Sequence, residues 1–282
     1  MSPQKPLRVA VTGCNGKVGK HAVDALLAAG HEVFGIDRRP PGRDDINSIV
    51  ADLTDYGQTF DALGSVGWDI LGDTTDRTFD VVVHLAAVPH PRMFGNAETF
   101  ANNVTAAYNV FEACRRLGLR DVVLASSETV LGVPFDDTIT YLPLDEDSPR
   151  RGRNAYGLSK LLIEQIAEEY TKNDPELRVT ALRLSYVQDV EEYAQYPVRR
   201  RPRLPHLGPV VLHRRPRHRH RPRKGPALPA PRLRDLPHRR FPHVSVKGEL
   251  GDRTPLLSDE AAKQRLGFHP QHSWRDHVSS QS

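Results

Sequence analysis

The sequence is poor in the residues that build several classes of protein. Its 282 residues include only two cysteines, Cys14 and Cys114, which excludes a disulfide scaffold and a cysteine-rich zinc site. Aromatic residues make up 7%, and no run approaches the roughly 18 apolar residues of a membrane-spanning helix. The first six residues, Met-Ser-Pro-Gln-Lys-Pro, lack the apolar core of a secretion signal. We therefore expect a cytoplasmic protein without a membrane partner.

Positive charge is concentrated in one segment, residues 197–243. This segment holds 15 of the 39 Lys and Arg residues, one acidic residue (Asp235), eleven prolines and six of the 13 histidines. The rest of the chain has 24 basic and 34 acidic residues, so the net charge of +4 conceals an acidic protein with one basic block. The His-Arg-His spacing in the block does not match a structural zinc site, and we expect no metal.

Three interpretations of residues 197–243 are open. Arginine clusters can grip nucleic-acid phosphates, but no aromatic side chain for base stacking occurs before Phe241, so we expect no nucleic-acid partner. The segment could be a disordered insertion, because it lacks the apolar residues to form a core. It could also come from the wrong reading frame of a GC-rich gene, since such DNA encodes Arg, Pro, His and Ala. We favour the frameshift.

The first 185 residues alternate between strand-like and helix-like runs. Strands are expected at 7–12, 32–36, 81–85, 121–126 and 178–184, and helices at 17–29, 98–117 and 155–170. Residues 81–85 are apolar on both faces, as in strands of parallel sheets. The alternation predicts an α/β fold with a doubly wound, Rossmann-like parallel sheet. Near the C-terminus, residues 258–266 are expected to form a further short helix with Ser258 as its N-cap.

A glycine-rich run links the first strand to the first helix. Residues 12–19 read Thr-Gly-Cys-Asn-Gly-Lys-Val-Gly, a Gly-x-x-Gly-x-x-Gly pattern. Glycines let the backbone turn tightly and approach a pyrophosphate, which the free N–H groups of the following helix attract. The expected cofactor-binding residues of this loop are Gly13, Asn15, Gly16, Lys17, Val18 and Gly19.

An acidic residue, Asp37, ends the second strand. A carboxylate at this place can accept both ribose hydroxyls of adenosine and repels a 2′-phosphate, which favours NAD over NADP. Arg38 follows at once and could pair with such a phosphate, so NADP stays possible. Asp52 and Leu53 come after a further strand that is expected between residues 37 and 52, and either an adenine contact or an ordinary turn aspartate is expected there.

Ser127, Tyr156 and Lys160 make up the expected catalytic group. Tyr156 and Lys160 are four residues apart on a helix, so their side chains share one face. An ammonium near a phenol favours the phenolate and is expected to lower the pKa of Tyr156. The tyrosine could then act as general base or acid at a sugar carbinol, with the Ser127 hydroxyl orienting the same oxygen.

These motifs occur in one order, together with His-Leu-Ala-Ala at 84–87, Asn-Val-Thr at 103–105 and Ser-Ser at 126–127. Over residues 7–190 the sequence resembles the extended short-chain dehydrogenase/reductases, the NAD-dependent epimerase/dehydratase family. The resemblance implies an NAD(P)-binding Rossmann domain at 1–190 and a small C-terminal substrate lobe at 191–282. It also implies hydride transfer at the carbinol of a sugar or nucleotide sugar, with Ser127, Tyr156 and Lys160 as the catalytic triad.

Further roles come from the same resemblance. Asn103 is expected to support the active-site network, and the nicotinamide end of the cofactor is expected to lie beside Ala86 and Ala87. A homodimer is expected through the helices that begin near Glu98 and Ala155. The resemblance also implies cofactor contacts outside the residues named above. These residues are Leu85, Ala86, Ala87, Asn103, Tyr156 and Lys160.

The sequence departs from the family in two places. The 4,6-dehydratases carry Asp-Glu directly after the Ser or Thr, whereas this chain has Glu128 and Thr129, so the second acid needed for water elimination is missing. Residues 183–188 lack the Asn and Gly-Pro usual in nucleotide-sugar enzymes, and the Ser-Ser run resembles the uronate-type sugar dehydrogenases. We therefore expect a sugar dehydrogenase or epimerase. The alternative is a non-catalytic NAD(P)-binding protein whose substrate lobe is damaged by 197–243.

Overall fold

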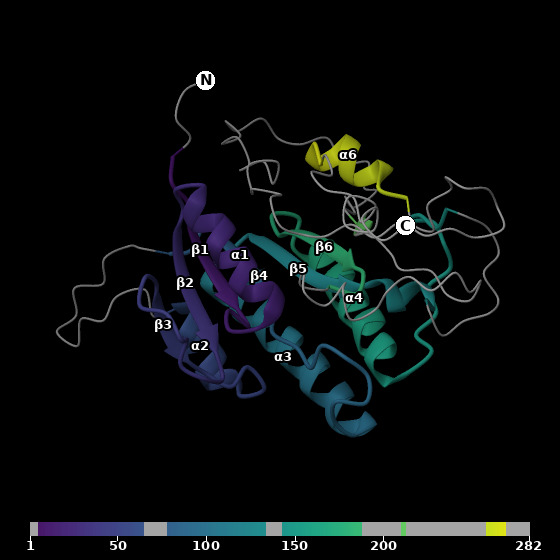
Figure 1. Cartoon of the computed structure of the whole chain (residues 1–282), viewed down its shortest axis with the longest axis horizontal. Coiled ribbons are helices and arrows are strands. Elements are labelled where there is room, and N and C mark those ends of the chain that lie inside the picture. The colour runs from purple at the N-terminus through teal and green to yellow at the C-terminus, as the bar shows by residue number, and fades with distance from the viewer. Residues whose placement is uncertain (1–4, 65–77, 134–142, 188–209, 213–257, 269–282) are drawn as a thin grey trace, which may run out of the picture.

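A computed structural model describes residues 5–64, 78–133, 143–187, 210–212 and 258–268. Six parallel strands form one sheet, and a short antiparallel strand, β7, extends its edge in the order β3-β2-β1-β4-β5-β6-β7 (Figure 1). The strands are β1 (Arg8–Thr12), β2 (Glu32–Asp37), β3 (Asn47–Val50), β4 (Val81–His84), β5 (Asp121–Ser127), β6 (Arg178–Leu184) and β7 (Val210–Leu212). The chain reverses its direction of travel across the sheet between β1 and β4, so ligands are expected at their carboxyl ends. The predicted doubly wound, Rossmann-like α/β fold is confirmed.

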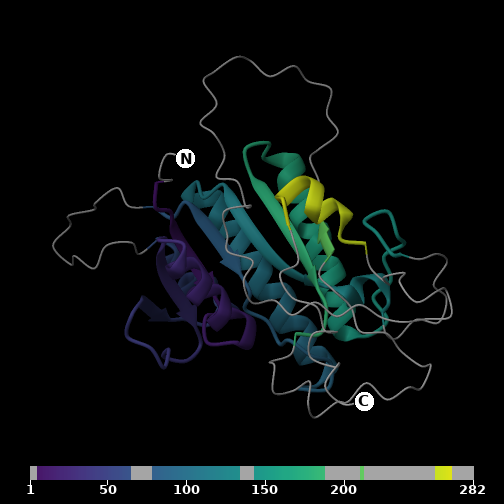
Figure 2. The same ribbon diagram turned by 45° about the horizontal axis from the view of Figure 1, so that its top comes forward.

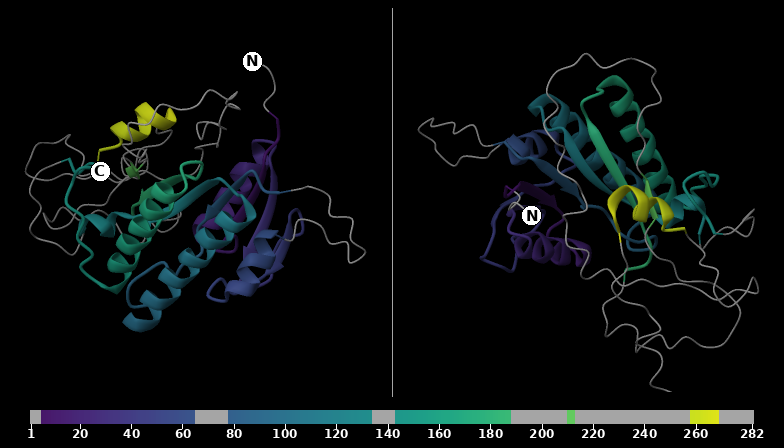
Figure 3. Two further views of the ribbon diagram at one scale, coloured as in Figure 1. Left: turned by 180° about the vertical axis from the view of Figure 1, so that it is seen from behind. Right: turned by 90° about the horizontal axis from the view of Figure 1, so that it is seen from above.

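Helices cover both faces of the sheet (Figures 2 and 3). Helix α1 (Lys17–Ala28) packs on one face, and α6 (Glu260–Leu266) contacts Leu182 on that same face. The opposite face carries α2 (Tyr56–Gly64), α3 (Asn96–Leu117) and α4 (Ala155–Asn173). A short 3-10 helix, η1 (Glu128–Leu131), follows β5 directly.

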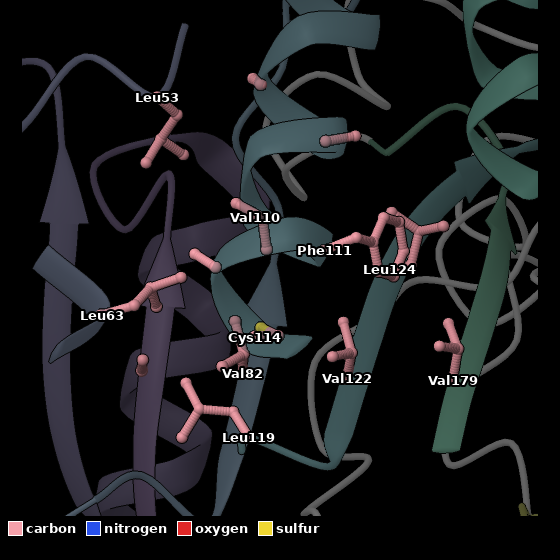
Figure 4. Packing of buried hydrophobic residues seen from close by; sticks show 14 of the residues in the cluster. Leu53, Leu63, Val82, Val110, Phe111, Cys114, Leu119, Val122, Leu124 and Val179 are labelled. Atoms are coloured by element: carbon pink, nitrogen blue, oxygen red, sulfur yellow. The ribbon is translucent and has the colours of Figure 1, made fainter. Parts of the chain in front are cut away.

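The core consists of two layers because successive strand residues point to opposite faces. Val82, Val122 and Leu124 pack under α3 and α4, and Figure 4 shows them with Val110, Phe111 and Cys114 of α3. Their sequence neighbours Val83 and Val123 face α1 instead. The apolar character of β4 and β5 on both faces therefore reflects burial on both sides.

The expected elements and the observed ones differ in a few places. Helix α2 was not predicted, since its nine residues bury only Thr59, Ala62 and Leu63. Helix α6 has Asp259 rather than Ser258 at its N-cap, although the Ser258 hydroxyl accepts the Glu260 N–H at 3.2 Å. Residues 197–243 show no strand period in the sequence, yet residues 210–212 within them form β7, which pairs with β6.

The other residues of 197–243 lie outside the described part of the chain. The three interpretations of that segment therefore stay predictions. The domain division at 190 stays a prediction for the same reason. Within the described ranges, no helix has the length and apolar character needed to cross a bilayer. No group of three or more His, Cys, Asp or Glu side chains in those ranges is placed to hold a metal ion.

Candidate active site

The glycine loop is folded tightly against the ends of its neighbouring strands. Gly13 has a φ of +71°, and a Cβ there would lie 2.7 Å from the Ala86 nitrogen. A Cβ on Gly19 would lie 2.0 Å from the Gly13 carbonyl oxygen. No side chain caps the first turn of α1 and no acidic residue occupies it. The cradle therefore admits only glycine at these two places and could hold a pyrophosphate at the start of α1.

Thr12 ties this loop to the end of β4, a role that the sequence analysis missed. Its hydroxyl oxygen accepts the N–H groups of Leu85 and Ala86, both at 3.2 Å, and lies 2.8 Å from Nδ1 of His84. Burial lowers the pKa of His84 to about 3, helped by the charge of Lys160. The imidazole is therefore neutral, so Nδ1 can accept the Thr12 proton.

Asp37 ends β2 as predicted and faces the same loop. Its carboxylate accepts the Asn15 N–H at 3.0 Å and the Arg39 N–H at 3.3 Å. Asp52 instead accepts the N–H and the hydroxyl of Thr54, at 2.9 and 2.8 Å, and the backbone bond is the main reason its pKa is lowered. These bonds describe the ordinary turn aspartate, and the adenine contact of Asp52 and Leu53 stays a prediction.

The structure brings Ser127, Tyr156 and Lys160 together. Ser127 ends β5, and its hydroxyl oxygen accepts the Thr129 N–H at 3.2 Å and the Thr129 hydroxyl at 3.0 Å. Its own proton is left to bond the phenol oxygen of Tyr156, with which Ser127 is hydrogen-bonded. The Lys160 ammonium lies 5.9 Å from the centre of the Tyr156 ring and donates to the Ala125 carbonyl at 2.7 Å. Both side chains come from the face of α4 that contacts β5.

Burial sets the pKa values of this group. Desolvation raises the pKa of Tyr156 to about 12; the Ser127 hydrogen bond acts in the opposite direction and the charge of Glu128 adds to the rise. Desolvation also lowers the pKa of Lys160 to about 8, which Glu164 partly opposes. The expected lowering of the Tyr156 pKa is therefore wrong for the protein's own groups, because desolvation of the phenolate dominates.

Asn103 holds the surrounding backbone. Its amide oxygen accepts the Val88 N–H at 2.7 Å, and its amide nitrogen donates to the Val88 carbonyl at 3.1 Å and to the Ser159 hydroxyl at 3.3 Å. The Asn102 side chain donates to the same amide oxygen. Asn103 thus connects the segment after β4 to α4 beside Lys160, and its amide has no bonding capacity left, so a direct cofactor contact stays a prediction.

An ion pair that was not predicted joins Glu164 and Arg183 close to Lys160. Glu164, one helical turn further along α4, accepts two bonds from Arg183 of β6, at 3.0 and 2.9 Å, and the Ser126 hydroxyl at 2.6 Å. Both charged side chains are buried. Only the spacing of Glu164 from Lys160 could have indicated this pair in the sequence, because the approach of Arg183 depends on the pairing of β5 with β6.

Glu128 is a second buried acid at the site. It follows Ser127 directly, and one carboxylate oxygen, Oε2, is buried without a hydrogen-bond partner among the described residues. Desolvation raises its pKa well above the usual value, although a hydrogen bond from the Tyr186 backbone acts against the rise. The sequence showed Glu128 only as a departure from the dehydratase pattern, since burial of a charged residue has no signal in the sequence.

Comparison with known proteins extends this description. The model of the NAD dependent epimerase/dehydratase family matches residues 9–188. The UDP-glucose 4-epimerase 3 of Oryza sativa subsp. japonica is 29% identical over 226 residues, which cover 74% of this chain and 57% of that protein. The chain spans about half the length of the curated relatives it matches.

Solved structures agree with this result. A short-chain dehydrogenase/reductase superfamily protein from Agrobacterium tumefaciens with bound NAD superposes with a TM-score of 0.56 and 29% identity, covering 68% of this chain and 53% of that one. MoeE5 in complex with UDP-glucose and NAD gives a TM-score of 0.53 and 32% identity, covering 64% and 55%. Fold, glycine loop and family match therefore agree, and the chain belongs to the NAD dependent epimerase/dehydratase family.

Proposed function

We propose that this chain is an NAD-dependent sugar epimerase that acts on a nucleotide sugar through Tyr156. The observation that carries the proposal is the buried Ser127–Tyr156–Lys160 group at the carboxyl edge of the sheet, near a loop that admits only glycine at Gly13 and Gly19. The relatives support the substrate class, because they include UDP-glucose 4-epimerases from a plant and from Bacillus subtilis. The MoeE5 structure, with UDP-glucose and NAD, supports it further.

The residues present fit NAD. The glycine loop and the start of α1 would hold the pyrophosphate, and Asp37 would accept the hydroxyls of the adenosine ribose. Its carboxylate is already oriented by the Asn15 and Arg39 N–H groups, and its charge would repel a 2′-phosphate. The exposed Arg38 is the feature that keeps NADP as the second choice.

The chain's own residues would manage one proton. Tyr156 would take it from a sugar hydroxyl and later return it. Ser127 would donate a hydrogen bond to the phenol oxygen, and the Lys160 ammonium, fixed by the Ala125 carbonyl, would favour the phenolate. Bound NAD would supply the hydride acceptor, which is also the hydride donor on return, and a positive charge that favours the phenolate further.

Two further expectations are part of this proposal. The substrate lobe is assigned to residues 191–282, beyond the Rossmann domain at 1–190. The homodimer is assigned to α3 and α4, which pack against each other and expose Tyr108 and Leu158.

A second function is favoured by one observation. The family match ends at residue 188, before the Arg-, Pro- and His-rich segment begins at 197. A chain with a damaged substrate lobe would bind NAD through its first domain and have no sugar to act on.

A product assay separates these functions. The NAD-loaded protein is incubated with UDP-glucose, UDP-galactose, UDP-glucuronic acid and the corresponding free sugars, and products are followed by NMR and by absorbance at 340 nm. An epimerase forms the epimer of a nucleotide sugar without net NADH, because the hydride returns to the substrate. Steady NADH formation would show a dehydrogenase instead, and NAD binding without turnover on the whole panel would favour the non-catalytic protein.

A further inference from the structure

Glu128, directly after Ser127, has a buried carboxylate oxygen without a hydrogen-bond partner among the described residues. Only 8% of the residue is exposed, and Oε2 has no hydrogen-bond partner within the described ranges. The residue starts η1, between Ser127 and Thr129, and its charge acts on the phenol of Tyr156. Buried polar atoms in folded proteins nearly always have a partner, so Oε2 has an unused bonding position that a ligand could fill.

The position of Glu128 in the sheet indicates which ligand. The cofactor elements follow β1, β2 and β4, whereas Glu128 follows β5 and is bonded by the backbone of Tyr186, which follows β6. In the strand order, Glu128 therefore lies beyond β4, outside the half of the sheet that is expected to hold the cofactor. It is close enough to Tyr156 for its charge to act on the phenol. A molecule that presents a hydroxyl to Tyr156 would place its neighbouring groups close to Glu128.

We propose that Glu128 is a substrate-contacting residue whose Oε2 hydrogen-bonds a hydroxyl of the sugar ring next to the carbon on which Tyr156 acts. The inference rests on the proposed function, because it names a contact within that substrate site. No bond is made or broken in this contact. It adds a specificity-determining residue to the reaction of Tyr156.

The protonation state of Glu128 fits this role. Burial favours the neutral acid, which can donate from Oε2 while its other oxygen accepts from the Tyr186 backbone. A neutral side chain also suits the reaction, since an ionised Glu128 would raise the pKa of Tyr156 and oppose the phenolate. Glutamine reproduces the shape and both bonds of the neutral acid, whereas methionine keeps the length and removes the bonds.

The test measures binding to the NAD-loaded protein by calorimetry, with UDP-glucose and UDP as the two probes. Glu128→Met and Glu128→Ala are expected to weaken UDP-glucose binding about tenfold and to leave UDP binding within about twofold, because UDP has no sugar ring. Glu128→Gln is expected to keep UDP-glucose affinity within about threefold of the wild type. NAD affinity and the unfolding temperature verify that each variant is folded.

Glu146→Gln is the matched control. Glu146 also has a buried oxygen without a partner among the described residues, but the charges acting on it are those of Arg265, Asp145 and Arg183. Both affinities should stay unchanged in this variant.

Three results would overturn the inference. One is wild-type UDP-glucose affinity in folded Glu128→Met and Glu128→Ala, which removes the contact and leaves the proposed function intact. Another is an equal loss of UDP and UDP-glucose affinity, which shows a structural role for Glu128. If the wild-type protein binds neither probe, the nucleotide-sugar substrate of the proposed function fails, and the inference falls with it.

Discussion

At the residue scale, burial determines the chemistry of the site. The side chains of Tyr156, Lys160 and Glu128 are all desolvated, and this favours the neutral form of each. The pKa values of Tyr156 and Glu128 are therefore raised, and that of Lys160 is lowered. A buried ammonium disfavours the folded state, so removing the charge of Lys160 is expected to stabilise the fold. The cost of burying this charge can be measured by replacing Lys160.

Replacing Lys160 by methionine is expected to stabilise the fold at pH 7. The pKa of Lys160 is about 8 in the folded chain and near 10.5 when exposed, so the unfolded chain binds the extra proton between these values. The cost of burying the charge is therefore complete below pH 8 and fades as the pH rises to 10.5. Allowing for the lost bond to Ala125, Lys160→Met should raise the free energy of unfolding by about 2 kcal/mol at pH 7.

Urea denaturation of wild type and variant at pH 7 and pH 10 measures this difference. The difference in the free energy of unfolding should shrink strongly at pH 10. An equal difference at both values would contradict the lowered pKa of Lys160.

The sequence predicted which residues of the candidate site lie close together better than it predicted their pKa values. Ser127, Tyr156 and Lys160 could be named because helical spacing and strand ends place them. The raised pKa of Tyr156 and the burial of Glu128 could not, because desolvation depends on the packing of α4 and η1 over β5.

At the element scale, the glycine loop packs tightly against the start of α1. The expected strands matched the observed ones within one or two residues, since apolar runs bounded by turns are clear signals. Helix α2 was missed because its buried stripe is short. The ion pair of Glu164 with Arg183 was missed because the approach of these two residues depends on the pairing of β6 with β5.

Replacing Gly19 by alanine tests the loop. The added Cβ would lie 2.0 Å from the Gly13 carbonyl oxygen, so the loop must shift. We expect a loss of roughly 1–3 kcal/mol, a fall in unfolding temperature of about 2–10 °C, and NAD affinity weakened at least about tenfold. Gly42→Ala is the control, because a Cβ at that exposed glycine meets nothing within 4 Å. Equal behaviour of the two variants would contradict the tight cradle.

At the scale of the whole molecule, the described residues form a Rossmann-like sheet whose carboxyl edge gathers the predicted site. The sheet could be predicted because strands and helices alternate regularly over the first 185 residues. Sequence reasoning gave no structure for 197–243, because Arg, Pro and His without a repeating apolar pattern indicate neither helix nor strand. The three residues of β7 were therefore unexpected.

The most direct test of the central claim compares turnover and NAD binding in Tyr156→Phe. The phenol oxygen is the only atom removed, so the account predicts at least a 100-fold loss of turnover on the sugar that the product assay identifies, with NAD affinity within about twofold of the wild type. Tyr56→Phe, at an exposed position on α2, should behave as the wild type. Turnover by Tyr156→Phe at a rate close to that of the wild type would contradict the account.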